Sequence, residues 1–117
     1  MTWPIHSALM EPVARAVAPL IQGLESVRDP SVPFYAPDGS VVLAGEQVRT
    51  LLGSEFVHPT LWNATFEAMV AAGHRAFLEV GPGEMLGRMS RWIDRSVAVH
   101  RAGTPAEIAR LADILRS

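Results

Sequence analysis

The chain has 117 residues, of which 49% are hydrophobic and 19% charged, with a formal net charge of −2. This size predicts a single domain, 1–117, with a real core, and the charge excludes a long basic field for nucleic acid. Cysteine is absent, which excludes disulfides, thiolate nucleophiles and cysteine-ligated metals.

The first half of the chain predicts three helices and a short strand. Apolar spacings of three and four indicate a helix over 9–24 that begins near Pro12 or is kinked there. A strand over 33–36 is expected to close at a Pro-Asp-Gly turn, followed by a second strand or an extended link. Helices over 46–52 and 60–72 follow, the second stopped by a glycine.

The second half alternates strand and helix. Strands are predicted over 76–80 and 96–100, with a helix over 84–94 between them. A last helix is predicted to begin at Pro105, with Thr104 as its cap. Trp92 shares the apolar spacing of the 84–94 helix, so we expect it to pack inward.

The order of elements predicts an α/β fold. We expect a short, mostly parallel sheet of about three strands, 33–36, 76–80 and 96–100, with flanking helices. Parallel sheets normally have cover on both faces, so this thin sheet suggests that further polypeptide packs against it.

Gly81-Pro82-Gly83 forms a strand-turn-helix junction, a place where α/β proteins bind phosphate. Leu86 stands where the dinucleotide motif needs a third small residue, and Glu84 would repel an anion. A tight structural turn is therefore preferred to a nucleotide site.

The histidines and arginines each allow two interpretations. The four histidines have no short-spaced pair, so a metal site is not expected, and each one is either a surface group or a base. Arg88, Arg91 and Arg95 form a stripe on the 84–94 helix, which is either a solvated face or a docking patch for an acidic protein.

Four motifs in order, IHSALMEP, VPFYAPDG, FVHPTLW and FLEVGPGEML, resemble the C-terminal part of the malonyl-CoA–acyl carrier protein transacylase family. This family includes the acyltransferase domains of fatty acid and polyketide synthases. The resemblance implies the C-terminal part of an α/β-hydrolase-like large subdomain. The half with the nucleophile and the ferredoxin-like small subdomain would be absent.

By this resemblance, His6 occupies the place of the catalytic histidine, the general base and acid in acyl transfer. Glu55 would orient His6 through its main-chain carbonyl oxygen, not through its side chain. Trp3, Pro4 and Ile5 precede the histidine, where polyketide acyltransferases set acyl preference. They match neither the usual malonyl nor the usual methylmalonyl pattern, so the acyl group stays open.

The resemblance also implies the reaction and its participants. The family moves a malonyl-type acyl group from coenzyme A to the thiol of an acyl carrier protein through a serine ester. It uses no cofactor besides the coenzyme A thioester substrate. The Arg88, Arg91 and Arg95 stripe would dock the carrier protein. A nucleic acid partner is not expected because the net charge is −2, and a membrane partner is not expected because no apolar run approaches the roughly 18 residues of a membrane span. A cytoplasmic location is expected, since no signal peptide is evident.

None of the eight serines has glycine two residues before and two after it, so the Gly-x-Ser-x-Gly nucleophile is missing. The chain alone is therefore expected to be inactive. A complementary N-terminal half would complete it, or the chain would associate with itself. Alternatively, the chain is a non-catalytic acyltransferase remnant that binds a carrier protein or scaffold.

Overall fold

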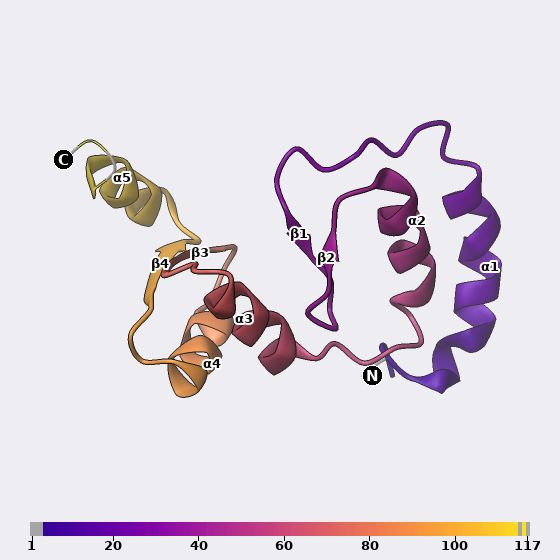
Figure 1. Cartoon of the computed structure of the whole chain (residues 1–117), viewed down its shortest axis with the longest axis horizontal. Helices are drawn as coiled ribbons and strands as arrows, with labels where there is room; N and C mark the ends of the chain where they lie inside the picture. The colour runs from indigo at the N-terminus through magenta and orange to yellow at the C-terminus, as the bar shows by residue number, and fades with distance from the viewer. Residues whose placement is uncertain (1–3, 115, 117) are drawn as a thin grey trace. The chain divides into compact units, whose positions relative to one another are not determined.

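The computed structural model describes residues 4–114 and Arg116 (Figure 1). The chain divides into two compact units, one up to Thr65 and one from Phe66. Trp3 lies outside the described residues. The elements, in chain order, are η1 (Ala8–Met10, a 3-10 helix), α1 (Glu11–Gln22), β1 (Phe34–Tyr35), β2 (Val41–Val42), α2 (Gly45–Ser54), α3 (Trp62–Ala71), β3 (Ala76–Val80), α4 (Met85–Ile93), β4 (Ala98–Ala102) and α5 (Pro105–Ile114).

The first unit contains α1 and α2, which lie side by side in Figure 1. The helix over 9–24 was expected either to begin near Pro12 or to be kinked there. The first alternative is the one found, because α1 begins at Glu11 and Pro12 lies in its first turn. There proline removes only an N–H group that has no partner within the helix. Arg49 joins the two helices, since its guanidinium donates to the carbonyl oxygen of Ile21 at 2.8 Å near the end of α1.

The strand predicted over 33–36 belongs to a hairpin and not to the parallel sheet, so the prediction of three strands in that sheet was wrong. β1 pairs with β2 in antiparallel orientation, with Phe34 opposite Val42. The chain reverses at Gly39, whose φ of 86° suits glycine. Because the turn is this tight, β1 pairs with the segment that follows it.

The second unit contains the parallel pair, in which β3 lies beside β4 with Ala76 opposite Ala98 and Val80 opposite Ala102. The α/β class with a parallel sheet and flanking helices is therefore confirmed. β4 begins two residues later than predicted because the Asp94 carboxylate accepts hydrogen bonds from the side chain and the N–H of Ser96. These bonds, first that of the Ser96 hydroxyl, hold the pKa of the Asp94 carboxyl below its usual value.

The buried centre of the second unit includes Phe66 on α3, which is fully buried. Its ring centroid lies 4.7 Å from that of Phe77 on β3, with the ring planes tilted by 43°. Such a pair buries large aromatic area in a favourable tilted geometry. Among the described residues, no helix is long and apolar enough to cross a membrane.

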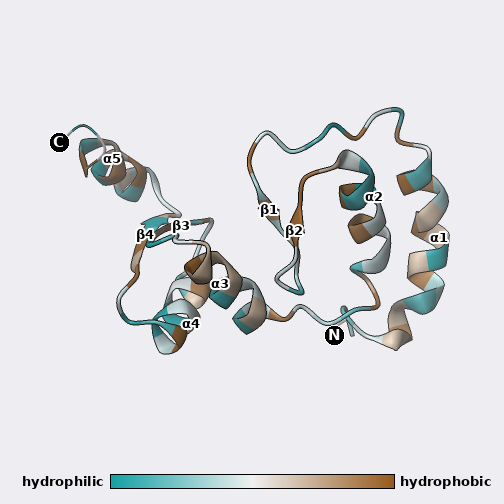
Figure 2. Ribbon diagram, viewed as in Figure 1, coloured by the Kyte–Doolittle hydropathy of each residue, from teal (hydrophilic) through white to brown (hydrophobic). Residues whose placement is uncertain are grey.

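The inward orientation predicted for Trp92 was wrong, because its side chain is 85% exposed. α4 instead buries Gly87 and Ser90. A Cβ atom at Gly87 would lie 2.9 Å from Glu79 Oε2 and 3.1 Å from the Val99 side chain on β4, so a larger residue there would force these side chains to shift. The apolar residues of α4, brown in Figure 2, include Met85, which is exposed like Trp92.

Candidate active site

His6 lies two residues before the start of η1, separated from it by Ser7, in an unusual backbone conformation. Its φ is 66°, in the left-handed region, which is uncommon for residues other than glycine. The N–H of His6 donates to the carbonyl oxygen of Phe56 at 3.0 Å. The Ser7 hydroxyl donates to the carbonyl oxygen of Pro4 at 2.7 Å, which closes the same turn. These two bonds hold a backbone conformation that would otherwise be costly.

The imidazole of His6 contacts Glu55, the residue directly before Phe56. Its Nδ1 lies 2.8 Å from the main-chain oxygen of Glu55. A carbonyl oxygen only accepts, so Nδ1 carries the hydrogen and, in the neutral ring, Nε2 keeps its lone pair. The His6 side chain is 40% exposed. The structure thus contains the contact that the resemblance implies, while the catalytic roles of both residues stay predictions.

The Glu55 carbonyl is available because α2 ends at this point. Glu55 follows the last residue of α2, and its N–H still donates to Leu51. In a longer helix its carbonyl oxygen would accept from the residue four positions later, which is Pro59. Proline has no N–H and disfavours helix at the preceding residue. The oxygen is therefore left for His6.

The Glu55 side chain also approaches His6. Its Oε2 lies 4.0 Å from Nδ1, and the side chain is 33% exposed. This separation is too long for a hydrogen bond but short enough for a direct charge interaction. From the sequence, only the main-chain oxygen of Glu55 was expected to have a role, and the proximity of the carboxylate was not predicted.

Pro4 and Ile5, expected to affect acyl preference, lie on the exposed stretch before His6, and Ile5 is 52% exposed. Their role stays a prediction. His58 makes a contact of the same kind as His6, because its Nδ1 lies 3.0 Å from the Ser54 oxygen. In the described part of the chain, no three His, Asp or Glu side chains gather as a metal site.

The turn Gly81-Pro82-Gly83 precedes α4, and N–H groups at the start of this helix already have hydrogen-bond partners. The Glu79 carboxylate accepts hydrogen bonds from the N–H groups of Leu86 and Gly87, both at 3.0 Å. An internal carboxylate thus occupies the N-terminus of α4, where a phosphate would bind. This arrangement disfavours the nucleotide alternative, and the contribution of Glu79 was not predicted from the sequence.

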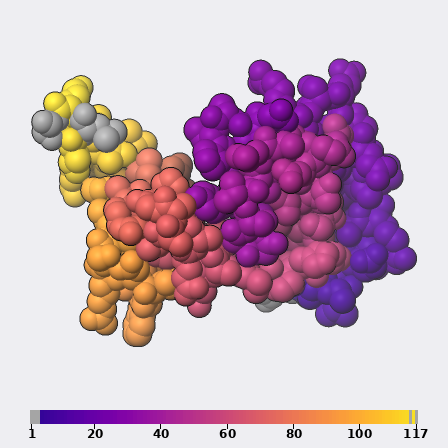
Figure 3. All heavy atoms as spheres, viewed as in Figure 1, coloured from indigo at the N-terminus to yellow at the C-terminus, as the bar shows by residue number. Residues whose placement is uncertain are grey.

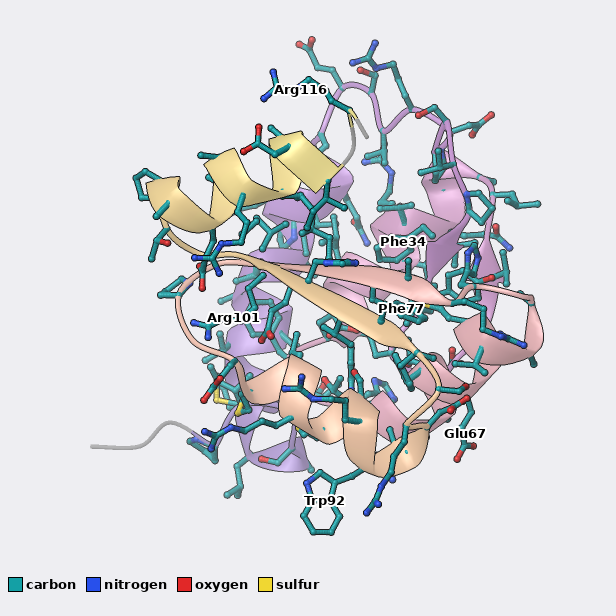
Figure 4. All side chains as sticks on the ribbon, turned by 90° about the vertical axis from the view of Figure 1, so that its left-hand side faces the viewer. Phe34, Glu67, Phe77, Trp92, Arg101 and Arg116 are labelled. Carbon is teal, nitrogen blue, oxygen red and sulfur yellow. The ribbon has the colours of Figure 1, made fainter. Side chains whose placement is uncertain are left out.

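The arginine stripe was predicted on one helix, but only Arg88 and Arg91 lie on α4, while Arg95 lies in the turn after it, because the helix ends at Ile93. The charge of this stripe is only partly neutralised. Arg88 pairs with Glu84, as its spacing of four residues predicts. Arg91 and Arg95 form no ion pair with any described residue. Together with Trp92, the three arginines line a shallow groove. Figure 4 shows the Trp92 indole pointing away from the helix, and Figure 3 shows side chains of the orange segment that holds α4 projecting from the surface.

Comparison with known proteins confirms the resemblance to transacylases. No family model matches the chain. The malonyl CoA-acyl carrier protein transacylase of Haemophilus influenzae is 30% identical over 91 residues, 77% of this chain and 29% of that protein. The Escherichia coli K12 protein of the same name is 27% identical over 112 residues, 95% of this chain and 36% of that protein. The chain therefore spans about a third of the length of these relatives.

Solved structures show the same partial match. An acyl-carrier-protein-S-malonyltransferase from Bartonella henselae superposes with a TM-score of 0.88 at 27% identity, over all of this chain and 37% of that one. A malonyl-transacylase in complex with its type II PKS acyl-carrier protein superposes with a TM-score of 0.85 at 27% identity, over 97% of this chain and 37% of that one. The chain is thus similar in sequence and in fold to part of these acyltransferases.

Proposed function

We propose that this chain, similar over its length to about a third of the malonyl-CoA–acyl carrier protein transacylases, supplies the general base of such an acyltransferase. The observation that supports this most directly is the contact of His6 Nδ1 with the Glu55 oxygen. It leaves Nε2 able to accept a proton, and the exposed ring can be reached by a second group.

The proposed reaction has two transfers. A serine hydroxyl loses its proton to His6 Nε2 while its oxygen bonds to the malonyl carbonyl carbon. The bond from that carbon to the coenzyme A sulfur then breaks, and Nε2 returns the proton to the sulfur. The carrier-protein thiol reverses the sequence and takes the acyl group from serine. No cofactor takes part, and the acyl group is of malonyl type.

The serine would come from a complementary N-terminal polypeptide, since no serine of this chain lies in Gly-x-Ser-x-Gly. The second unit offers a surface that such a polypeptide could cover, because Leu78 and Val80 on β3 are exposed although they are apolar. Association of two copies would cover the same surface but would not supply the nucleophile. We propose that the chain and this polypeptide together form one acyltransferase domain in the cytoplasm.

Labelling with radioactive malonyl-CoA tests the proposal. The purified chain alone is expected to take up no covalent label. Co-expressed with an N-terminal transacylase polypeptide that carries Gly-x-Ser-x-Gly, the chain should form a complex that is labelled on that serine, and hydroxylamine should release the label as expected for an ester. Label on this chain alone, or an unlabelled complex, would contradict the proposal.

A second candidate function is an interaction module that binds a carrier protein or scaffold without catalysis. The exposed Trp92 beside Arg91 and Arg95 favours it, because aromatic and arginine side chains are common in protein interfaces. Acidic carrier surfaces would complement these charges. The same groove would also dock the carrier protein of an active complex.

Reversal of charge in Arg91→Glu/Arg95→Glu tests this docking surface. We expect carrier binding to weaken by about tenfold at low salt and the difference to shrink in high salt, because exposed charges are screened. Titration calorimetry with an acyl carrier protein measures both. Arg15→Glu/Arg28→Glu makes the same charge change on exposed residues of the first unit and serves as the control. Equal weakening by both variants would show that only net charge matters.

A further inference from the structure

We propose that the Glu55 carboxylate is a second positioning group for His6 and stabilises the protonated imidazole by its charge. The inference rests on the proposed function for its purpose, because a general base becomes a cation when it takes the serine proton. The contact itself can be tested on this chain alone.

One residue reaches His6 Nδ1 through two different oxygen atoms. The main-chain oxygen of Glu55, at 2.8 Å, accepts the hydrogen bond and fixes which nitrogen carries the hydrogen. The carboxylate oxygen Oε2, at 4.0 Å, lies beyond hydrogen-bond range. The carbonyl is a dipole without net charge, whereas the carboxylate carries a full negative charge. The two oxygens therefore have separate effects: the first orients the ring and the second favours its charged form.

The surroundings of His6 make this charge distinct. Among residues 4–114 and Arg116, Glu55 is the one acidic residue within 4.0 Å of a His6 ring nitrogen. The other groups that hold His6 are uncharged, namely the carbonyl oxygens of Glu55 and Phe56. Both side chains of the pair are partly exposed, so dissolved salt should weaken the interaction.

During acyl transfer the charge would act in the proposed step. As the serine proton moves to Nε2, the ring acquires a positive charge close to Oε2. The negative carboxylate lowers the energy of that state more than the energy of the neutral ring. It gives the ring no proton and takes none, so it acts as a positioning residue through His6.

His58 is a matched internal comparison. Its Nδ1 also contacts a main-chain oxygen, that of Ser54 at 3.0 Å. No described acidic side chain lies within 4.0 Å of its ring nitrogens. His58 therefore shares the orienting carbonyl with His6 but lacks the neighbouring charge.

Glu55→Gln isolates the charge, because it keeps the main-chain oxygen and the size of the side chain. Diethyl pyrocarbonate, which modifies unprotonated imidazole, is the probe. At pH 5.5 and low salt we expect His6 in Glu55→Gln to react about two to five times faster than in the wild-type chain. At 0.5 M NaCl, or at pH 8 where histidine is ordinarily neutral, the two rates should become equal.

Mass spectrometry of the arginine-cleaved chain measures the rate, because the fragment that ends at Arg15 contains no histidine other than His6. Glu55→Asp keeps the charge, so His6 in this variant should be modified almost as slowly as in the wild-type chain. Glu25→Gln removes an exposed carboxylate elsewhere in the first unit and should leave the modification rate of His6 unchanged. The modification rate of His58 should be the same in all of these variants.

Equal His6 rates in wild type and Glu55→Gln at pH 5.5 and low salt would overturn the inference. A rate change that persists at pH 8 would also overturn it, because it would reflect access to the ring and not charge. These results do not depend on acyl transfer, so they are distinguishable from the malonyl-labelling result that tests the proposed function.

Discussion

In the complex of this chain with the serine-bearing polypeptide, His6→Ala is expected to lower the rate of acyl transfer about 10³-fold, because general acid–base catalysis typically contributes 10²–10⁴-fold. The loss should fall on kcat, with little change in KM for malonyl-CoA. The imidazole acts on the serine proton and is not assigned a contact with the coenzyme A portion. Stopped-time transfer of labelled malonyl to a carrier protein measures both constants.

Two further variants separate catalysis from folding. Alanine in the left-handed conformation of residue 6 is strained, so His6→Asn is also needed, since asparagine tolerates this conformation better. It should be as inactive as His6→Ala. His58→Ala removes a histidine with a similar carbonyl contact and should keep the wild-type rate within about twofold. Retention of activity in His6→Asn would remove His6 from the mechanism.

Phe66→Ala is expected to reduce the free energy of unfolding by about 3–5 kcal/mol, the usual cost of removing a fully buried aromatic ring. The variant loses the buried area of the ring and its contact with Phe77, and it leaves a cavity. Small domains are stable by only about 5–15 kcal/mol, so this variant should be close to unfolding. Urea denaturation followed by circular dichroism measures the change.

Phe34→Ala is the matched control, because it removes the same atoms from a side chain that is already 45% exposed. Its expected cost is about 1 kcal/mol, since much of the ring contacts water in the folded chain. Similar losses in the two variants would mean that the Phe66–Phe77 contact contributes little to the core. Phe34 and Phe77 can be located in Figure 4.

Element type was predictable wherever periodicity was strong. The helices and the strands that form the parallel pair follow from the spacing of apolar residues and from glycine and proline at the ends. Strand partners were less predictable, because the sequence around Phe34 indicates an extended segment without saying what it pairs with. The tight turn at Gly39 was the signal for the partner, since such a turn favours pairing with the segment that follows.

The orientation of α4 illustrates a second limit. Apolar periodicity predicts that a helix has an apolar face, but it does not identify the surface against which that face packs. α4 approaches the sheet through small residues, Gly87 and Ser90, whereas Trp92 lies exposed. The signal that could have revealed this is Gly87 itself, because glycine inside a helix often marks a close approach of two elements.

The candidate site was predictable only through the family resemblance. The partner of the His6 ring is a main-chain oxygen, which any residue type could supply, so no spacing of polar side chains points to it. The carboxylate of Glu55 could have been considered from residue type alone. Its distance from the ring depends on where α2 ends, which sequence patterns locate only within a few residues.

Pro59 has a consequence for how this site can be altered over evolution or by engineering. It contacts neither ring nitrogen in any described interaction, yet by withholding an amide it spares the Glu55 oxygen from competition. Any other residue there would carry an N–H group, which a helix extended to this position would direct at the Glu55 oxygen. A position without reactive chemistry of its own thus helps to keep the imidazole contact free, and searches for functional residues that weigh only reactive side chains would pass over it.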